Sequence, residues 1–146
     1  MTAHSPQPTR SPRDVVRSLH RATAAHDLDG IVAHFAPDYV LENPCRPDRS
    51  FRGADQVRRN WSHILAEMPD LLFEEHALSE EGSRVWTEIS MRGTRVDGSE
   101  HELRGVMIFR VEGGVIVTGT FYLAPVVRDG LDADAAVRST VSAPPS

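Results

Sequence analysis

Asn43 stands out because it places a polar amide on a side of the chain that is otherwise apolar. It lies in the segment DYVLENP, residues 38–44. In a strand, Tyr39, Leu41 and Asn43 project to the same side, because side chains alternate with a period of two. A buried carboxamide needs a hydrogen-bond partner. Two interpretations stay open: the amide bonds backbone at the strand end beside Pro44, or it lines a pocket and bonds a ligand or water.

The loop after this segment carries three arginines and the single cysteine. Arg46, Arg49 and Arg52 lie in CRPDRSFRG, residues 45–53. A guanidinium near a pocket mouth can hold a carboxylate or an enolate, although a solvated loop is the plainer interpretation. Cys45 has no base at a recognisable spacing, and alone it closes no intrachain disulfide.

The chain has seven histidines, which raises the question of a metal site or acid–base chemistry. His34 and His63 lie off the apolar stripes of their predicted helices, and His20 lies at the edge of one, so we expect these side chains to be mostly solvated. The facing of His76 and His101 stays open. No pair has the i, i+4 spacing of a helical metal site, so no metal or cofactor is expected.

Hydrophobic periodicity predicts the elements that would position these residues. It indicates three helices in residues 12–28, 27–37 and 53–71, with the second stopped by Pro37 and the third by Pro69. A strand lies between the second and third helices. Four further strands are expected near 71–78, 83–95, 100–111 and 115–125, joined by Gly- and Asp-containing turns as an antiparallel meander.

This order predicts an α+β fold in which a curved antiparallel sheet wraps around three N-terminal helices and encloses a pocket. Residues 13–127 form the expected domain. Residues 1–12 and 128–146 are expected to be weakly ordered tails, since they are rich in small and polar residues.

Strand parity divides the expected sheet into two faces. One face carries Thr87, Ile89, Met91, Met107 and Phe109, and it would form an apolar concave wall suited to a hydrophobic ligand. The other face mixes Trp86, Val106, Ile108 and Tyr122 with arginines and threonines. Such a mixture is typical of a subunit interface and predicts a homodimer.

Composition narrows the classes of partner. The net charge is -5 at pH 7, and no clustered basic patch exists to bind phosphate backbones, so no nucleic acid partner is expected. No apolar run approaches the roughly 20 residues of a membrane span, and the N-terminus has no signal-peptide pattern. We therefore expect a cytoplasmic protein with no membrane partner.

The element order, with the stretches AAHDLDGIVAHFAPDYVLENP, FRGADQVRRNW, MPDLLFEEHAL and EGGVIVTGTFYLAPV, resembles the nuclear transport factor 2-like superfamily, and most of all its SnoaL-like and ketosteroid-isomerase-like members. The resemblance covers about residues 14–127. It implies a cone-shaped fold with a pocket at the wide end, commonly a homodimer. Members include isomerases, polyketide cyclases, dehydratases, epoxide hydrolases and non-catalytic binding domains.

The catalytic groups of these relatives are mostly replaced in this chain. At the positions of the isomerase base, oxyanion tyrosine and protonated aspartate stand Asn43, Leu19 and Met107, and the acid of the SnoaL-like cyclases also matches Met107. Among the epoxide hydrolase positions only Asn43 matches. The other four positions are occupied by Leu41, Ile89, Met91 and Phe121.

We expect a SnoaL-like small-molecule enzyme, a cyclase, isomerase or dehydratase, that acts on a hydrophobic, polyketide-like substrate of secondary metabolism. Asn43 is the expected catalytic residue. The expected substrate-binding residues are Tyr39, Leu41, Arg46, Trp61, Thr87, Ile89, Met91, Met107, Phe109 and Phe121. The alternatives are a non-catalytic binding protein with the same pocket, or an epoxide hydrolase with a relocated carboxylate such as Glu88 or Glu42.

Overall fold

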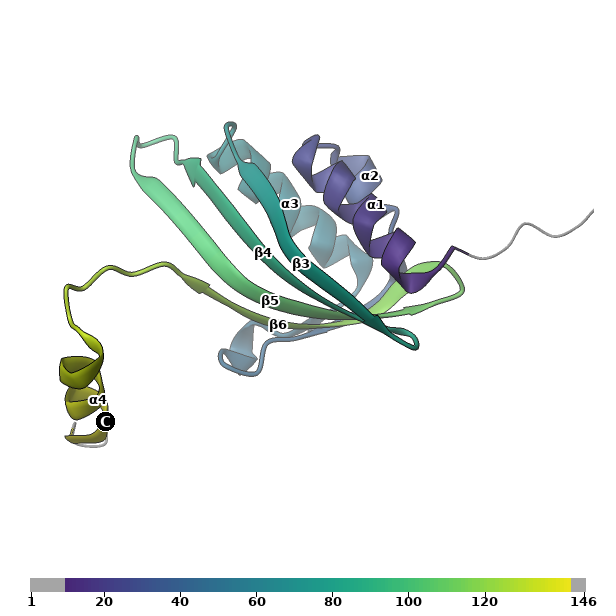
Figure 1. Ribbon diagram of the computed structural model, residues 1–146. Helices are drawn as coiled ribbons and strands as arrows, with labels where there is room; N and C mark the ends of the chain where they lie inside the picture. The colour runs from purple at the N-terminus through teal and green to yellow at the C-terminus, as the bar shows by residue number, and fades with distance from the viewer. Residues whose placement is uncertain (1–9, 143–146) are drawn as a thin grey trace, which may run out of the picture.

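The computed structural model describes residues 10–142 and shows one curved sheet with helices on its concave face. The six strands lie in the order β2 (Phe51–Arg52), β1 (Phe35–Glu42), β6 (Val115–Pro125), β5 (Glu100–Glu112), β4 (Arg84–Thr94) and β3 (Leu72–Glu81). Helices α1 (Pro12–Ala24), α2 (Leu28–Val32) and α3 (Ala54–Glu67) lie in the hollow of the sheet, which bends around them without closing (Figure 1). The α+β cone predicted from the sequence is confirmed.

Helices α1 and α3 form where the apolar stripes predict them. α1 runs over Pro12–Ala24; the Ser11 hydroxyl accepts a hydrogen bond from the Asp14 amide at 3.1 Å and caps its first turn. Its buried face includes Val15, Val16 and Leu19. α3 runs over Ala54–Glu67 and ends just before Pro69, as expected from the lack of a proline N–H.

The second helix is shorter than the sequence predicts. α2 covers only Leu28–Val32, and β1 (Phe35–Glu42) begins before the proline that was expected to stop the helix. Phe35 is therefore a strand residue, packed edge-on against Tyr39 with ring centroids 4.7 Å apart. The helical assignment of Phe35 was wrong. Phe35 has the spacing of the apolar residues of the preceding helix, but it is the first residue of β1.

β1 occupies an inner position that the predicted meander did not contain. It pairs in parallel with β6 (Val115–Pro125) and antiparallel with β2, which covers only Phe51–Arg52. The register with β6 shifts between Phe35 and Val40, and Pro37 lies in this irregular stretch, where a strand tolerates a residue without an N–H. The short 3-10 turn η1, Pro47–Arg49, lies between β1 and β2.

The remaining strands form the predicted antiparallel meander. They are β3 (Leu72–Glu81), β4 (Arg84–Thr94) and β5 (Glu100–Glu112), followed by β6. β3 lies at one edge of the sheet, and β2 lies at the other. β3 carries the exposed residues Glu74, Glu75, Glu80 and Glu81, and its register with β4 shifts between Glu75 and Ala77.

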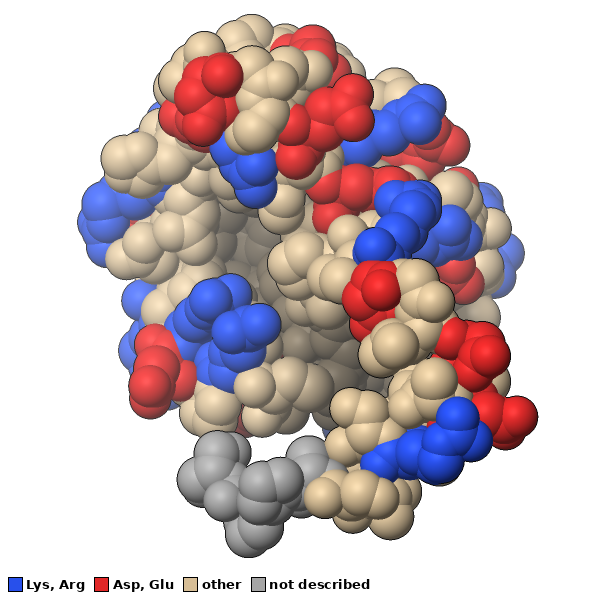
Figure 2. All heavy atoms as spheres, turned by 90° about the vertical axis from the view of Figure 1, so that its left-hand side faces the viewer, with Lys and Arg blue, Asp and Glu red and all other residues tan. Residues whose placement is uncertain are grey.

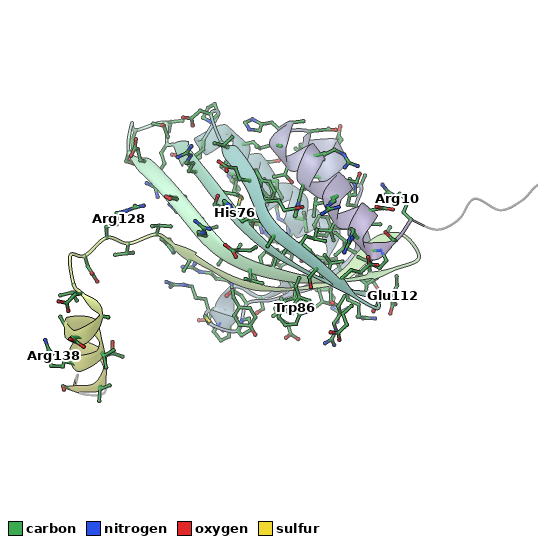
Figure 3. All side chains as sticks on the ribbon, in the orientation of Figure 1. Arg10, His76, Trp86, Glu112, Arg128 and Arg138 are labelled. Carbon is green, nitrogen blue, oxygen red and sulfur yellow. The ribbon has the colours of Figure 1, made fainter. Side chains whose placement is uncertain are left out.

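The strand parity predicted from the sequence also agrees with the burial. Val85, Thr87 and Ile89 of β4 and Phe109 of β5 are buried against the helices. Figure 3 shows Trp86 projecting from the opposite, convex face, away from the helices.

A glycine lets β5 and β6 approach closely at one point of the sheet. Gly105 has φ of 155°, and a Cβ built there would lie 2.0 Å from the Tyr122 carbonyl oxygen on β6. Because that atom is backbone, no side-chain movement could relieve the overlap. A glycine at such a position is typical of strongly curved sheets.

The C-terminal part contains a helix that the sequence pattern did not predict. α4, Ala133–Ser142, follows an extended segment after β6 and lies apart from the sheet and the other helices (Figure 1). Residues 1–9 and 143–146, which belong to the two tails expected from composition, lie outside the described residues.

Candidate functional site: an apolar cavity between the sheet and the helices

The hollow between the helices and the sheet contains a cavity of about 290 Å³. Its deep wall is made of buried residues from α1, the strands and α3: Leu19, His20, Thr23, Phe35, Tyr39, Leu41, Val57, Phe73, Met91, Met107 and Phe109. Its outer wall consists of the partly or fully exposed residues Asn43, Arg49, Phe51, Asn60, Trp61, Ile64, Leu103, Phe121 and Leu123. This gradient in exposure shows that the cavity opens to solvent at one end.

Figure 2 views the end of the molecule that lies to the left in Figure 1. That face is deeply hollowed, and uncharged side chains form the hollow, while arginines and acidic residues gather on its rim. A concave, mainly apolar site with a few polar groups is the usual form of a small-molecule pocket.

The structure brings together most of the residues expected to bind a substrate. Those that line the cavity are Tyr39, Leu41, Asn43, Trp61, Met91, Met107, Phe109 and Phe121. Arg46, Thr87 and Ile89 do not line it. The Thr87 hydroxyl donates to the Ala77 carbonyl oxygen at 3.2 Å, and Ile89 is fully buried. Since α1 packs against β4, the inward residues of this strand fill core space, and only Met91 reaches the cavity.

Asn43 follows directly after β1, and its main chain is held by hydrogen bonds. Its amide N–H donates to the Ser50 hydroxyl at 3.0 Å, and its carbonyl oxygen accepts from the Arg46 N–H at 3.0 Å. Among residues 10–142 no protein partner is found for its side-chain amide. The carboxamide on the cavity wall is therefore available to a ligand or water.

Two further polar side chains were not expected on this wall. Arg49, from the η1 turn, lines the cavity where Arg46 had been expected. Asn60 comes from α3, and its Oδ1 accepts a hydrogen bond from Gln56 Nε2 at 2.7 Å. This bond fixes the orientation of the amide, so the NH₂ group of Asn60 is left to donate elsewhere.

Tyr39 contributes a hydroxyl that stays protonated. Its side chain is almost completely buried, and burial raises the pKa of the phenol far above its ordinary value. Gly119 on β6 makes room for it, since a Cβ at that position would lie 2.2 Å from the Tyr39 hydroxyl oxygen. Tyr39 can therefore donate a hydrogen bond within an apolar surrounding but cannot act as a phenolate near neutral pH.

His20 is the ionisable group whose position differs most from the prediction. It was expected to be mostly solvated, yet it is 6% exposed and lines the cavity. Its Nδ1 lies 2.7 Å from Glu75 Oε1 on β3, and its ring packs against Phe73 with centroids 4.9 Å apart. The expectation failed because a position at the edge of an apolar stripe becomes interior when a strand covers that side of the helix.

The second ring nitrogen of His20 lacks a partner. Within the described part of the chain, Nε2 is the buried side-chain nitrogen or oxygen atom for which no hydrogen bond is found. A buried polar atom left unpaired costs about 1 to 3 kcal/mol, which makes it an exception that requires a reason. The spacing from Val16 and Thr23, four and three residues away on one helix face, was the available signal that His20 points inward.

Residues 10–142 show no cluster of three or more side chains suited to bind a metal ion. Within the same residues no helix is both long and apolar enough to cross a membrane.

The family model of the SnoaL-like domain matches residues 16–118. The chain belongs to the SnoaL-like domain family. A search of curated proteins finds no match to the chain.

Several solved structures share the fold at low identity. AclR of Streptomyces galilaeus, a candidate hydroxylase, is 21% identical with a TM-score of 0.68, covering 90% of this chain and 91% of its own. IdmH of Streptomyces antibioticus, a candidate polyketide cyclase, is 23% identical with a TM-score of 0.66, covering 80% and 92%. A Mycobacterium tuberculosis protein in complex with estradiol-17beta-hemisuccinate is 22% identical with a TM-score of 0.66, covering 86% and 98%.

Proposed function

We propose that the protein is a small-molecule enzyme that acts on a hydrophobic, polyketide-like substrate as a cyclase, isomerase or dehydratase. The observation that carries the proposal is the apolar cavity of about 290 Å³, in which Asn43, Arg49, Asn60 and Tyr39 supply a few hydrogen-bond donors. Such donors can orient a carbonyl and stabilise negative charge that develops on its oxygen. The structurally similar proteins include a candidate polyketide cyclase and a protein in complex with a steroid ester, which supports a hydrophobic, polyketide-like ligand.

A binding protein without catalytic activity is the second candidate. It is favoured by the residues at the positions of the superfamily's isomerase groups, because Leu19, Asn43 and Met107 all line the cavity and none can take up a proton near neutral pH. The third alternative, an epoxide hydrolase with Glu88 or Glu42 as the carboxylate, receives no support from their positions. Neither residue lines the cavity, and Glu88 pairs with Arg104 at 2.9 Å.

A measurement of substrate turnover distinguishes an enzyme from a binding protein without catalytic activity. Purified protein is incubated with a set of fused-ring ketones and linear poly-β-ketones, and consumption is followed by mass spectrometry. We expect consumption of at least one compound by the wild type and its loss in Leu123→Trp, which places an indole at the cavity mouth.

Leu131→Trp is the matched control, because Leu131 is exposed on the segment after β6 and does not line the cavity. Binding without consumption of any compound would leave the binding protein as the function. Equal consumption by both variants would place the reaction elsewhere and contradict the proposal.

We also propose that the protein forms a homodimer through the convex face of the sheet. Trp86 and Tyr122 are 45% and 46% exposed there, and Trp86 lines a shallow groove together with Val106 and with Ala77 and Ser79 of β3. Large exposed aromatic residues flanked by arginines are typical of subunit interfaces.

A further inference from the structure

His20 on the cavity wall pairs with Glu75, which lies behind that wall, and neither residue has a role in the proposed function. His20 comes from α1 and Glu75 from β3, which pack against each other. The two side chains meet at 2.7 Å between Nδ1 and Oε1. Arg17 lies on the far side of the same carboxylate, with its Nε 3.8 Å from Glu75 Oε2. Glu75 therefore bridges a buried imidazole and a partly exposed guanidinium.

This contact determines which nitrogen of His20 carries the hydrogen. An ionised carboxylate only accepts hydrogen bonds, so Nδ1 must be the N–H donor. In the neutral imidazole, Nε2 then holds the free electron pair. Because the two nitrogens lie on different edges of the ring, the bond to Glu75 directs Nε2 away from that carboxylate. The ring that carries this acceptor lines the apolar cavity.

The environment of the ring favours its neutral form. Burial lowers the pKa of His20 below 6.5; the hydrogen bond and charge of Glu75 oppose this effect, and the charge of Arg17 adds to it. The other charged or titratable residues of the cavity wall are Tyr39 on β1 and Arg49 on η1, and the wall residues from α3, β4, β5 and β6 are uncharged. Nε2 is therefore an unprotonated acceptor near neutral pH.

We propose that His20 is the general base of this cavity, that Glu75 positions it, and that the substrate is a fused-ring ketone with an acidic C–H beside its carbonyl. The inference rests on the proposed function, because it assigns the proton transfer within the same cavity. It supplies the base that is missing at Asn43, from a different element of the fold.

The proton transfer is balanced without a cofactor. Nε2 takes the proton from the carbon next to the carbonyl, the C–H electron pair becomes an enolate, and His20 becomes an imidazolium paired with the Glu75 carboxylate. If the enolate carbon attacks a second carbonyl of the same molecule, the new alkoxide takes the proton back from Nε2. Return of the proton to a different carbon gives an isomer instead. In both cases His20 ends neutral.

The donors on the cavity wall complement this role. The enolate oxygen can accept hydrogen bonds from the Asn60 NH₂ group, the Asn43 amide, the Arg49 guanidinium or the protonated Tyr39 hydroxyl. A base and donors for an enolate oxygen in one cavity are the groups that proton abstraction beside a carbonyl requires.

The test uses 2-tetralone, a bicyclic ketone with an acidic methylene, and tetralin, the same bicycle without the carbonyl. Binding of both to the full-length protein is measured by calorimetry. Exchange of the 2-tetralone methylene hydrogens for deuterium is then followed by NMR in D₂O. We expect the wild type to bind both compounds and to accelerate exchange, and His20→Phe to lose about 10² to 10⁴-fold of that acceleration.

Glu75→Gln tests the positioning role of Glu75. If His20→Phe proves unstable, this variant still tests the inference. We expect it to reduce the exchange rate and to lower the apparent pKa of the rate profile further, because the charge that raises the pKa of His20 is gone. His63→Gln, on the exposed side of α3 and away from the cavity wall, should behave as the wild type. ¹⁵N NMR of the His20 ring should show hydrogen on Nδ1 at pH 7.5 in the wild type.

The outcomes distinguish this inference from the proposed function. If tetralin and 2-tetralone bind but exchange is equal in the wild type and His20→Phe, the role of His20 is refuted while the hydrophobic pocket stands. If neither compound binds, the proposed function and the inference both fail. Hydrogen on Nε2, or an imidazolium at pH 7.5, overturns the inference whatever the binding result.

Discussion

The Tyr39 hydroxyl occupies space that only a glycine on the neighbouring strand leaves open. In Gly119→Ala, the new Cβ would lie 2.2 Å from that oxygen but 3.2 Å from the ring carbon bearing it. We expect the Tyr39 ring to move into the cavity, which costs about 1 to 3 kcal/mol of unfolding free energy and weakens ligand binding. Urea denaturation and calorimetry with tetralin would measure both effects.

The second substitution Tyr39→Phe should restore most of this loss, because it removes the atom that collides. Thr120→Ala, on the outward side of the same strand, is the control and should change stability by no more than about 0.5 kcal/mol. A Gly119→Ala protein that the Tyr39→Phe change destabilises further would contradict this explanation.

His20 should also affect how the free energy of unfolding depends on pH. Its pKa in the folded protein is below the ordinary 6.5, so the unfolded chain binds a proton first as the pH falls. The stability that His20 contributes is present above pH 6.5 and is lost as the pH falls through the lower folded pKa. Denaturation at a series of pH values should show a smaller loss for His20→Phe than for the wild type.

His101 also makes the free energy of unfolding depend on pH in this range, because burial and the charge of Arg95 lower its pKa. The difference between wild type and variant, not the pH dependence itself, is therefore the test. The depressed pKa values of Asp70 and Asp97 act only at pH values below their ordinary 3.8. Identical pH profiles for the wild type and His20→Phe would mean that the ring is not held neutral by the fold.

At the scale of elements, the close approach of β5 to β6 depends on Gly105. In Gly105→Ala the Cβ would meet the Tyr122 carbonyl oxygen at 2.0 Å, and φ of 155° strains any residue with a side chain. We expect a loss of about 3 kcal/mol or more. Val106→Ala, one residue along the strand, should cost less; thermal and urea unfolding would compare the two.

The sequence predicts elements well where one periodicity acts alone. The stripe Val57, Trp61 and Ile64 gives α3, and alternation along β4 gives the inward positions of Val85 and Ile89. Prediction failed at Phe35, where a helical stripe and a strand overlap, and at the parallel pairing of β1 with β6. That pairing joins segments about 80 residues apart and leaves no local pattern.

The candidate site could be predicted only in part for a related reason. Tyr39, Leu41 and Asn43 follow from the parity of one strand, which is local information. The burial of His20 depends on Glu75, 55 residues away, and on the strand that carries it. Whether a polar residue at the edge of an apolar helix stripe is buried depends on the element that packs over it. The residues of the helix do not specify that element.

At the scale of the whole molecule, the convex face of the sheet tests the proposed homodimer. Trp86→Glu would place a charge on this face, and we expect the species seen by sedimentation velocity at micromolar concentration to change from dimer to monomer. Val127→Glu, exposed beyond the end of β6, should remain a dimer. A wild type that sediments as a monomer would refute the dimer directly.

The sheet is open, so it has two free edges, and β3 forms the longer one. An uncovered edge offers unpaired backbone groups to another chain, and charged residues and bulges are the usual protection. Glu74 and Glu81, with the register shift after Glu75, give β3 both kinds of protection. Acid that neutralises these carboxylates would remove their mutual repulsion between molecules, so β3 is the strand at which acid-induced aggregation would begin.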